Sequence, residues 1–145
     1  TGKYINPVQI ENKIINSLSL ISYVCVIGKN KKFISAVIFI DFDMLKIFKN
    51  RMKMEKYNDI DFIKSDLLKK KVTKIINKVN IGLNPWERVV EFSISDKNPT
   101  IANNILTPSM KLRRNMIIKK NIEMAKDELP FWSQENNTEN LFYFL

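Results

Sequence analysis

Two apolar runs carry the strongest structural signal in this sequence: Ile21-Ser22-Tyr23-Val24-Cys25-Val26-Ile27 and Phe33-Ile34-Ser35-Ala36-Val37-Ile38-Phe39-Ile40. Both have the length of strands and are rich in β-branched and aromatic residues. The connector between them, residues 28–32, is short and polar and contains glycine and asparagine, so we predict a hairpin. The second run is apolar on both faces, which predicts a central strand that is covered on both sides.

Helices are predicted both before and after this hairpin in the sequence. Asn6 and Pro7 are typical of a helix start, and apolar residues then recur at four-residue spacing to about residue 18. The other predicted elements are a short helix through residues 45–48 opened by Asp41 or Asp43, a long helix from Ser65 or Asp66 to Gly82, a strand over 88–95 and a helix from about 113 to 126. This order predicts an α+β fold, a small domain with a sheet of about three strands packed by helices.

The amino-acid composition limits which class of protein this chain can belong to. The 145 residues are 45% hydrophobic and 27% charged, as expected for one globular domain. No apolar run has the length of a membrane span, and the first residues do not resemble a signal peptide. Because the chain begins with Thr1 and not with methionine, we expect a fragment or a processed form. Residues 141–145 are apolar, and packing onto the domain or a neighbour and contact with a membrane surface are both open interpretations.

The sequence has no histidine and one cysteine. A disulfide within the chain is therefore excluded, as are the Ser-His-Asp and Cys-His schemes of nucleophilic catalysis, and we expect no metal site. Any chemistry must use lysine, arginine, carboxylate, tyrosine or hydroxyl groups. Cys25 lies inside the first apolar run, so we expect a buried core thiol in a reducing compartment.

The formal charge is +9, from 24 basic and 15 acidic residues. A charge of this sign favours polyanionic partners such as nucleic acid, phosphorylated ligands or an anionic membrane, although a biased genome would explain it equally well. Many of the lysines lie on the outer face of the predicted long helix. A solvated surface is the simpler interpretation of that face, and a patch that contacts phosphate or membrane is the alternative.

A basic loop precedes the last predicted helix. It reads Leu106-Thr107-Pro108-Ser109-Met110-Lys111-Leu112-Arg113-Arg114, with three cations in four residues beside hydroxyl groups and a proline. A lysine on such a loop can reach a neighbouring site as a point charge. The simpler interpretation is a solvated loop before a helix.

Four stretches in order resemble the C-terminal domain of the AMP-forming acyl-CoA synthetases, specifically the long-chain fatty acid ligases. The basic loop is similar to their Glu-Asn-Gly-Glu-Leu-Thr-Pro-Thr-Leu-Lys-Leu-Lys-Arg stretch, and residues 2–12 resemble their Gly-Lys-Asn-Ile-x-Pro-x-x-Ile-Glu-Asn motif. Residues 26–36 resemble the family's Val-Ile-Gly hairpin, and residues 83–92 its Leu-x-x-x-Glu-x-Ile-x-x-Phe stretch. Asn104 stands in place of a turn glycine, and asparagine is the next-best residue for a left-handed turn.

The resemblance implies a ligase with two half-reactions. Residues 1–126 would be the mobile C-terminal domain, with residues 127–145 as an extension, and an absent N-terminal domain would bind most of the ATP, Mg²⁺ and fatty acid. Lys111 matches the catalytic lysine, which offsets charge while the carboxylate attacks ATP. Gly2 and Lys3 match the segment that lines the coenzyme A channel in the second half-reaction. The isolated domain is expected to be inactive.

Two alternatives stay open. An acyl carrier protein in place of coenzyme A as the acceptor would leave the same residues in this domain. A non-catalytic nucleic-acid-binding module would suit the charge, but aromatic residues are not interleaved with the basic ones, so no nucleic-acid partner is expected. The implied location is cytoplasmic, with peripheral membrane contact as an alternative.

Overall fold

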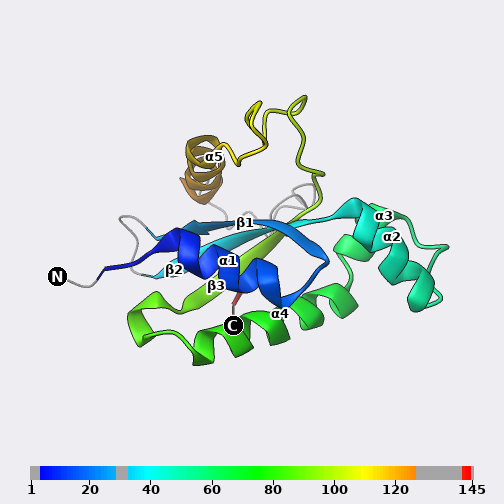
Figure 1. Cartoon of the computed structure of the whole chain (residues 1–145), viewed down its shortest axis with the longest axis horizontal. Coiled ribbons are helices and arrows are strands. Elements are labelled where there is room, and N and C mark those ends of the chain that lie inside the picture. The colour runs from blue at the N-terminus through cyan, green and yellow to red at the C-terminus, as the bar shows by residue number, and fades with distance from the viewer. Residues whose placement is uncertain (1–3, 29–32, 127–141, 145) are drawn as a thin grey trace.

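The computed structural model describes residues 4–28, 33–126 and 142–144 (Figure 1). Its elements in chain order are α1 (Pro7–Ser17), β1 (Ile21–Ile27), β2 (Ile34–Ile40), α2 (Phe42–Arg51), α3 (Asp59–Ile63), α4 (Asp66–Ile81), the 3₁₀ helix η1 (Pro85–Glu87), β3 (Val89–Ser95), α5 (Arg114–Lys126) and β4 (Phe142–Phe144). The α+β class predicted from the sequence is confirmed. None of the helices in these ranges is both long and apolar enough to cross a membrane.

The sheet is mixed, with strand order β1-β2-β3-β4. β1 and β2 form the predicted antiparallel hairpin, in which Val24 lies opposite Ile38. β3 pairs with β2 in parallel, because the chain crosses over through α2, α3 and α4 before it returns. All residues of β2 are buried, so the prediction of a central covered strand is confirmed.

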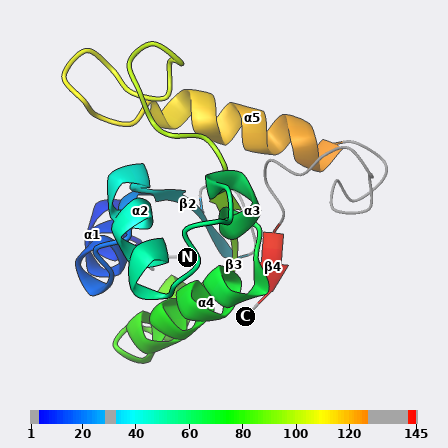
Figure 2. The ribbon, with the colours of Figure 1, turned by 90° about the vertical axis from the view of Figure 1, so that its right-hand side faces the viewer.

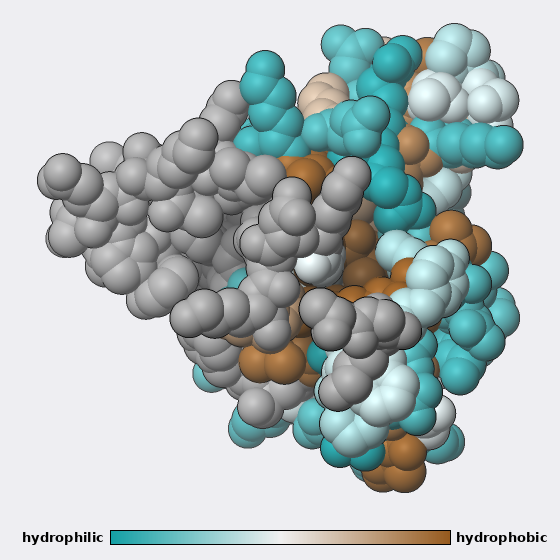
Figure 3. All heavy atoms as spheres, turned by 90° about the vertical axis from the view of Figure 1, so that its left-hand side faces the viewer, coloured by the Kyte–Doolittle hydropathy of each residue, from teal (hydrophilic) through white to brown (hydrophobic). Residues whose placement is uncertain are grey.

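Helices cover the sheet on both faces (Figures 1 and 2). Successive side chains of a strand point to opposite faces, and β2 supplies apolar residues to both. One set, which includes Ala36 and Ile38, packs against α1 and α4 in the larger core cluster. The other set, Val37 and Phe39, packs with Cys25 of β1 and Ile117 of α5 in a smaller cluster. Seen from the end of the sheet where α1 begins, hydrophobic side chains show in the middle of the molecule (Figure 3).

Polar side chains cap the helix starts. The Asn6 side chain accepts a hydrogen bond from the Gln9 backbone N–H at 3.2 Å, as its place before Pro7 predicts. Of the two aspartates considered for α2, Asp41 is the cap, since its carboxylate accepts from the backbone of the next turn. Ser65 caps α4 by accepting from the Leu68 N–H at 3.3 Å.

Three elements were not expected from the sequence: the 3₁₀ helix η1, α3 and β4. α3 is a five-residue helix that begins after the cap Asn58, in a segment too short to show helical periodicity. β4 lies antiparallel to β3, with Tyr143 opposite Phe92, and so adds a fourth strand to a sheet for which about three were predicted. An unpaired edge of β3 would expose backbone polar groups, and residues 142–144 pair with that edge. Packing onto the domain is therefore the observed arrangement of these three residues.

Candidate functional site

Lys111 lies on a compact turn between β3 and α5. Leu106 and Leu112 face each other as an antiparallel bridge at the base of this turn. The Thr107 N–H donates to the Lys111 carbonyl at 2.7 Å, and the Met110 N–H donates to the Thr107 carbonyl at 2.8 Å. The Thr107 hydroxyl accepts from the Lys111 N–H at 3.2 Å. The backbone of Lys111 is therefore held by hydrogen bonds while its side chain is exposed to solvent.

The residue before the lysine has an unusual backbone. Met110 has a φ of 65°, in the left-handed region that non-glycine residues seldom adopt. Its carbonyl accepts a hydrogen bond from the Tyr23 hydroxyl at 2.9 Å. Tyr23 belongs to β1, so this contact ties the turn to the sheet.

A second contact holds the chain on the C-terminal side of Lys111. The Arg114 guanidinium donates to both carboxylate oxygens of Glu11, with Nη2 at 2.6 Å from Oε1. The Glu11 carboxylate also accepts from the Val26 backbone N–H at 2.7 Å, and Glu11 is only 5% exposed. The hydrogen bonds that Arg114 donates to Glu11 hold the pKa of Arg114 above its ordinary value, against the opposing effect of burial. This arrangement fixes the first residue of α5 to α1 and β1.

Glu11 was not among the predicted functional residues. The feature that could have pointed to Glu11 is its place on α1 between Ile10 and Ile14, which are both fully buried. A carboxylate next to an apolar helix face predicts a buried partner of opposite charge, because an unpaired buried charge is costly. The sequence pattern does not say which arginine or lysine supplies that charge.

The loop that leads to the turn is built around the Asn103 side chain. Its oxygen accepts from the Thr100 N–H at 3.1 Å and from the Ile105 N–H at 3.2 Å. Its amide group donates to the Asn98 carbonyl at 2.8 Å. Asn104 has a φ of 63°, which confirms the left-handed turn expected where the resembling sequences have glycine. This network gives the loop before Lys111 a defined shape.

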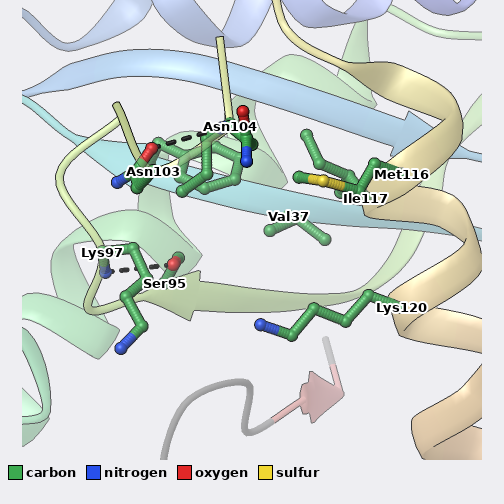
Figure 4. Close-up of a pocket in the computed structure, with 10 residues that line it drawn as sticks. Val37, Ser95, Lys97, Asn103, Asn104, Met116, Ile117 and Lys120 are labelled. Carbon is green, nitrogen blue, oxygen red and sulfur yellow. Dashed lines mark hydrogen bonds between the residues drawn. The ribbon is translucent and has the colours of Figure 1, made fainter. Parts of the chain in front are cut away.

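A pocket of about 290 Å³ lies between the sheet and α5. Val37 of β2 forms its floor, Met116 and Ile117 of α5 form one wall, and the Asn103–Asn104 turn forms another (Figure 4). Lys97 and Lys120 also line it, and they lie on opposite sides of the same view. One wall of the pocket is α5, and α5 directly follows the turn that bears Lys111.

The predicted site residues are only partly placed. Lys111 and Arg113 are both exposed on the turn, and the catalytic role of Lys111 stays a prediction. Gly2 and Lys3 lie outside the described residues, so their predicted role with coenzyme A stays a prediction. Within the part of the chain that the structure describes, no group of three cysteine, aspartate or glutamate side chains could hold a metal ion.

Residues 1–122 match the family model of the AMP-binding enzyme C-terminal domain. A curated relative, the probable acyl-activating enzyme 16, chloroplastic, of Arabidopsis thaliana, is 25% identical over 123 residues, which are 81% of this chain and 16% of that protein. The chain therefore spans about a sixth of that relative.

Solved structures share the fold. The A-PCP didomain of carboxylic acid reductase from Segniliparus rugosus in complex with AMP aligns with a TM-score of 0.61 at 22% identity, over 84% of this chain and 15% of that one. The adenylation domain of the carboxylate reductase from Mycobacterium chelonae aligns with a TM-score of 0.58 at 18% identity, over 81% and 17%. In both proteins the matching region is a small part of a larger chain.

Proposed function

Because this chain belongs to the family of AMP-binding enzyme C-terminal domains, we propose that it is the C-terminal domain of a long-chain fatty acid–CoA ligase. Membership makes it a domain of an adenylate-forming enzyme. The choice of a fatty acid as substrate and coenzyme A as acceptor rests on the resemblance of its motifs to those of the long-chain ligases. Family membership also favours an enzyme over a nucleic-acid-binding module.

The observation that supports the proposal most directly is the geometry of Lys111. Its backbone is fixed by the Thr107 contacts, and its ammonium group is free to reach beyond the surface of the domain. A cation with this combination suits a partner site on another domain better than a role in the core, because it contributes little to packing here.

In the first half-reaction a fatty acid carboxylate oxygen attacks the α-phosphorus of ATP. The bond from that phosphorus to the bridging oxygen breaks, and pyrophosphate leaves. Negative charge gathers between two anionic reactants, and the Lys111 ammonium offsets it from a fixed position. ATP and its Mg²⁺ are assigned mainly to an N-terminal adenylation domain, which is the proposed partner of this one.

In the second half-reaction the thiolate of coenzyme A attacks the acyl carbon of the adenylate, and AMP leaves. The domain turns between the two steps, so that Lys111 moves away and the Gly2–Lys3 segment lines the thiol channel. A glycine there would let the backbone approach the ligand closely. Acyl carrier protein is the alternative acceptor.

The test uses the intact protein that contains this domain, with the two half-reactions assayed separately. Lys111→Ala is expected to slow acyl-adenylate formation by about 10²-fold or more, as loss of one preorganised charge partner does. Thioester formation from supplied acyl-adenylate should be much less affected. Lys119→Ala, an exposed lysine of α5, is the control and should leave both rates nearly unchanged.

Equal losses in both steps, or no loss in the first, would contradict the role of Lys111. Substrates are assigned in the same assay by comparing palmitate with short-chain acids, and coenzyme A with acyl carrier protein. The 145-residue chain alone should form no acyl-adenylate from ATP and palmitate.

A further inference from the structure

We infer that Tyr23 is a positioning residue for Lys111 in acyl-adenylate formation, an inference that rests on the proposed function. Tyr23 and Met110 are 87 positions apart in sequence, and the tyrosine hydroxyl donates to the Met110 carbonyl at 2.9 Å. That carbonyl belongs to the peptide unit that joins Met110 to Lys111. The contact therefore fixes the peptide plane from which the lysine side chain departs.

The lysine side chain cannot by itself hold its ammonium group at a defined position. Its ammonium is a point charge on a flexible four-carbon stem, so the domain can determine only where the stem begins. A misplacement of about 1 Å at a reacting site can cost as much as 10²-fold in rate. A contact from outside the turn that fixes the orientation of the Met110–Lys111 peptide therefore helps to place the ammonium group.

The backbone at Met110 gives a reason why an outside contact is needed. A φ of 65° is unfavourable for methionine, because its Cβ crowds the backbone in the left-handed region. Met110 is 53% exposed, so packing of its own side chain does little to compensate. The hydrogen bond from Tyr23 stabilises the peptide in the orientation that this φ produces.

Tyr23 is itself well placed for this task. It lies on β1, paired with Phe39 of the buried strand β2, and it packs against the cluster beneath α5 together with Leu112. The hydroxyl is thus presented by a rigid strand. Arg114 and Glu11 hold the chain on the other side of the lysine, so loss of the tyrosine hydroxyl should loosen the turn without releasing it.

The experiment compares Tyr23→Phe with the parent in the intact protein. The variant keeps the ring and removes one hydrogen bond, so acyl-adenylate formation should slow by about three- to tenfold, the equivalent of about 0.65–1.4 kcal/mol. Thioester formation from supplied acyl-adenylate should stay within about twofold, because Lys111 has then left the site. Hydrogen exchange of residues 107–112 should become faster, while that of β1 and β2 stays unchanged. Tyr57→Phe, at an exposed tyrosine between α2 and α3, is the matched control and should alter neither rate.

Lys111→Ala in the same experiment distinguishes a failure of the positioning role of Tyr23 from a failure of the proposed function. If Lys111→Ala slows acyl-adenylate formation and Tyr23→Phe does not, the positioning role is wrong and the proposed function stands. If Tyr23→Phe slows both half-reactions equally, the tyrosine has only a structural role and the inference is overturned. If Lys111→Ala leaves the first step unchanged, the proposed role of the lysine is wrong, and the positioning role falls with it.

Discussion

Glu11 and Arg114 are 103 positions apart in sequence and form a bidentate ion pair, with Nη2 at 2.6 Å from Oε1. The pair lies at the outer edge of β1, the first strand in the sheet order. The Glu11 carboxylate also accepts the Val26 N–H at 2.7 Å, so one side chain satisfies an edge-strand donor and a guanidinium together. α1 and α5, on opposite faces of the sheet, are thereby joined around its edge.

We predict that Glu11→Gln lowers the free energy of unfolding by about 2 kcal/mol. Breaking a buried pair typically costs about 3–5 kcal/mol, and the Arg114 side chain is 36% exposed, so solvent offsets part of that loss. The measurement is urea unfolding of the 145-residue chain, which we expect to fold cooperatively because β2 contributes buried residues to both core clusters. Glu55→Gln, the same change at an exposed residue, should have almost no effect. Equal unfolding midpoints for the two variants would contradict a stabilising role of the pair.

The Cys25 thiol should make stability fall at alkaline pH. Burial raises the pKa of Cys25 from 9.0 to about 12, with Arg114 lowering it and Glu11 raising it. Above pH 9 the unfolded chain loses the thiol proton while the folded chain keeps it, so folding becomes less favourable. The loss should approach about 1.4 kcal/mol per pH unit between pH 9 and 12 and be absent below pH 9.

The measurement for Cys25 is urea unfolding between pH 8 and 11, compared with Cys25→Ala. Other groups titrate in both proteins, so the difference between the two slopes isolates the thiol. The parent should show the steeper decline. Identical slopes, or rapid alkylation of the native thiol at pH 8, would show that Cys25 is not protected in the way its burial predicts.

Met110→Gly should raise the free energy of unfolding by about 1 kcal/mol. Glycine adopts a φ of 65° without the Cβ conflict that methionine has there, and this gain exceeds the entropy that glycine adds to the unfolded chain. Thermal unfolding provides the measurement. Met52→Gly is the matched control, since Met52 is also exposed but has a φ of −85°, and it should lower the melting temperature. A decrease for both variants would show that the left-handed conformation at Met110 carries little strain.

Local patterns predicted most of the elements because their causes act over a few residues. The caps at Asn6 and Ser65 and the apolar hairpin strands are visible in the sequence, and each forms where its pattern stands. Asn104 took the left-handed conformation expected of it. α3 was missed because five residues show too little of a helical period, and β4 because three residues become a strand only beside the edge of β3.

The role of Lys111 is a prediction from the resemblance to the long-chain ligases, and the threonine, proline and lysine that carry this part of the resemblance lie within five residues of one another. The Thr107 contacts within the turn are local, whereas the contacts that attach the turn to the rest of the domain arise only in the tertiary structure. Tyr23 reaches Met110 because strand alternation and hairpin register put it on the α5 face, and Glu11 reaches Arg114 because α1 packs beside the edge strand. Hydrophobic periodicity says which face of an element is buried. Which distant side chains then meet depends on how the packed elements are placed in space, and no local pattern specifies that.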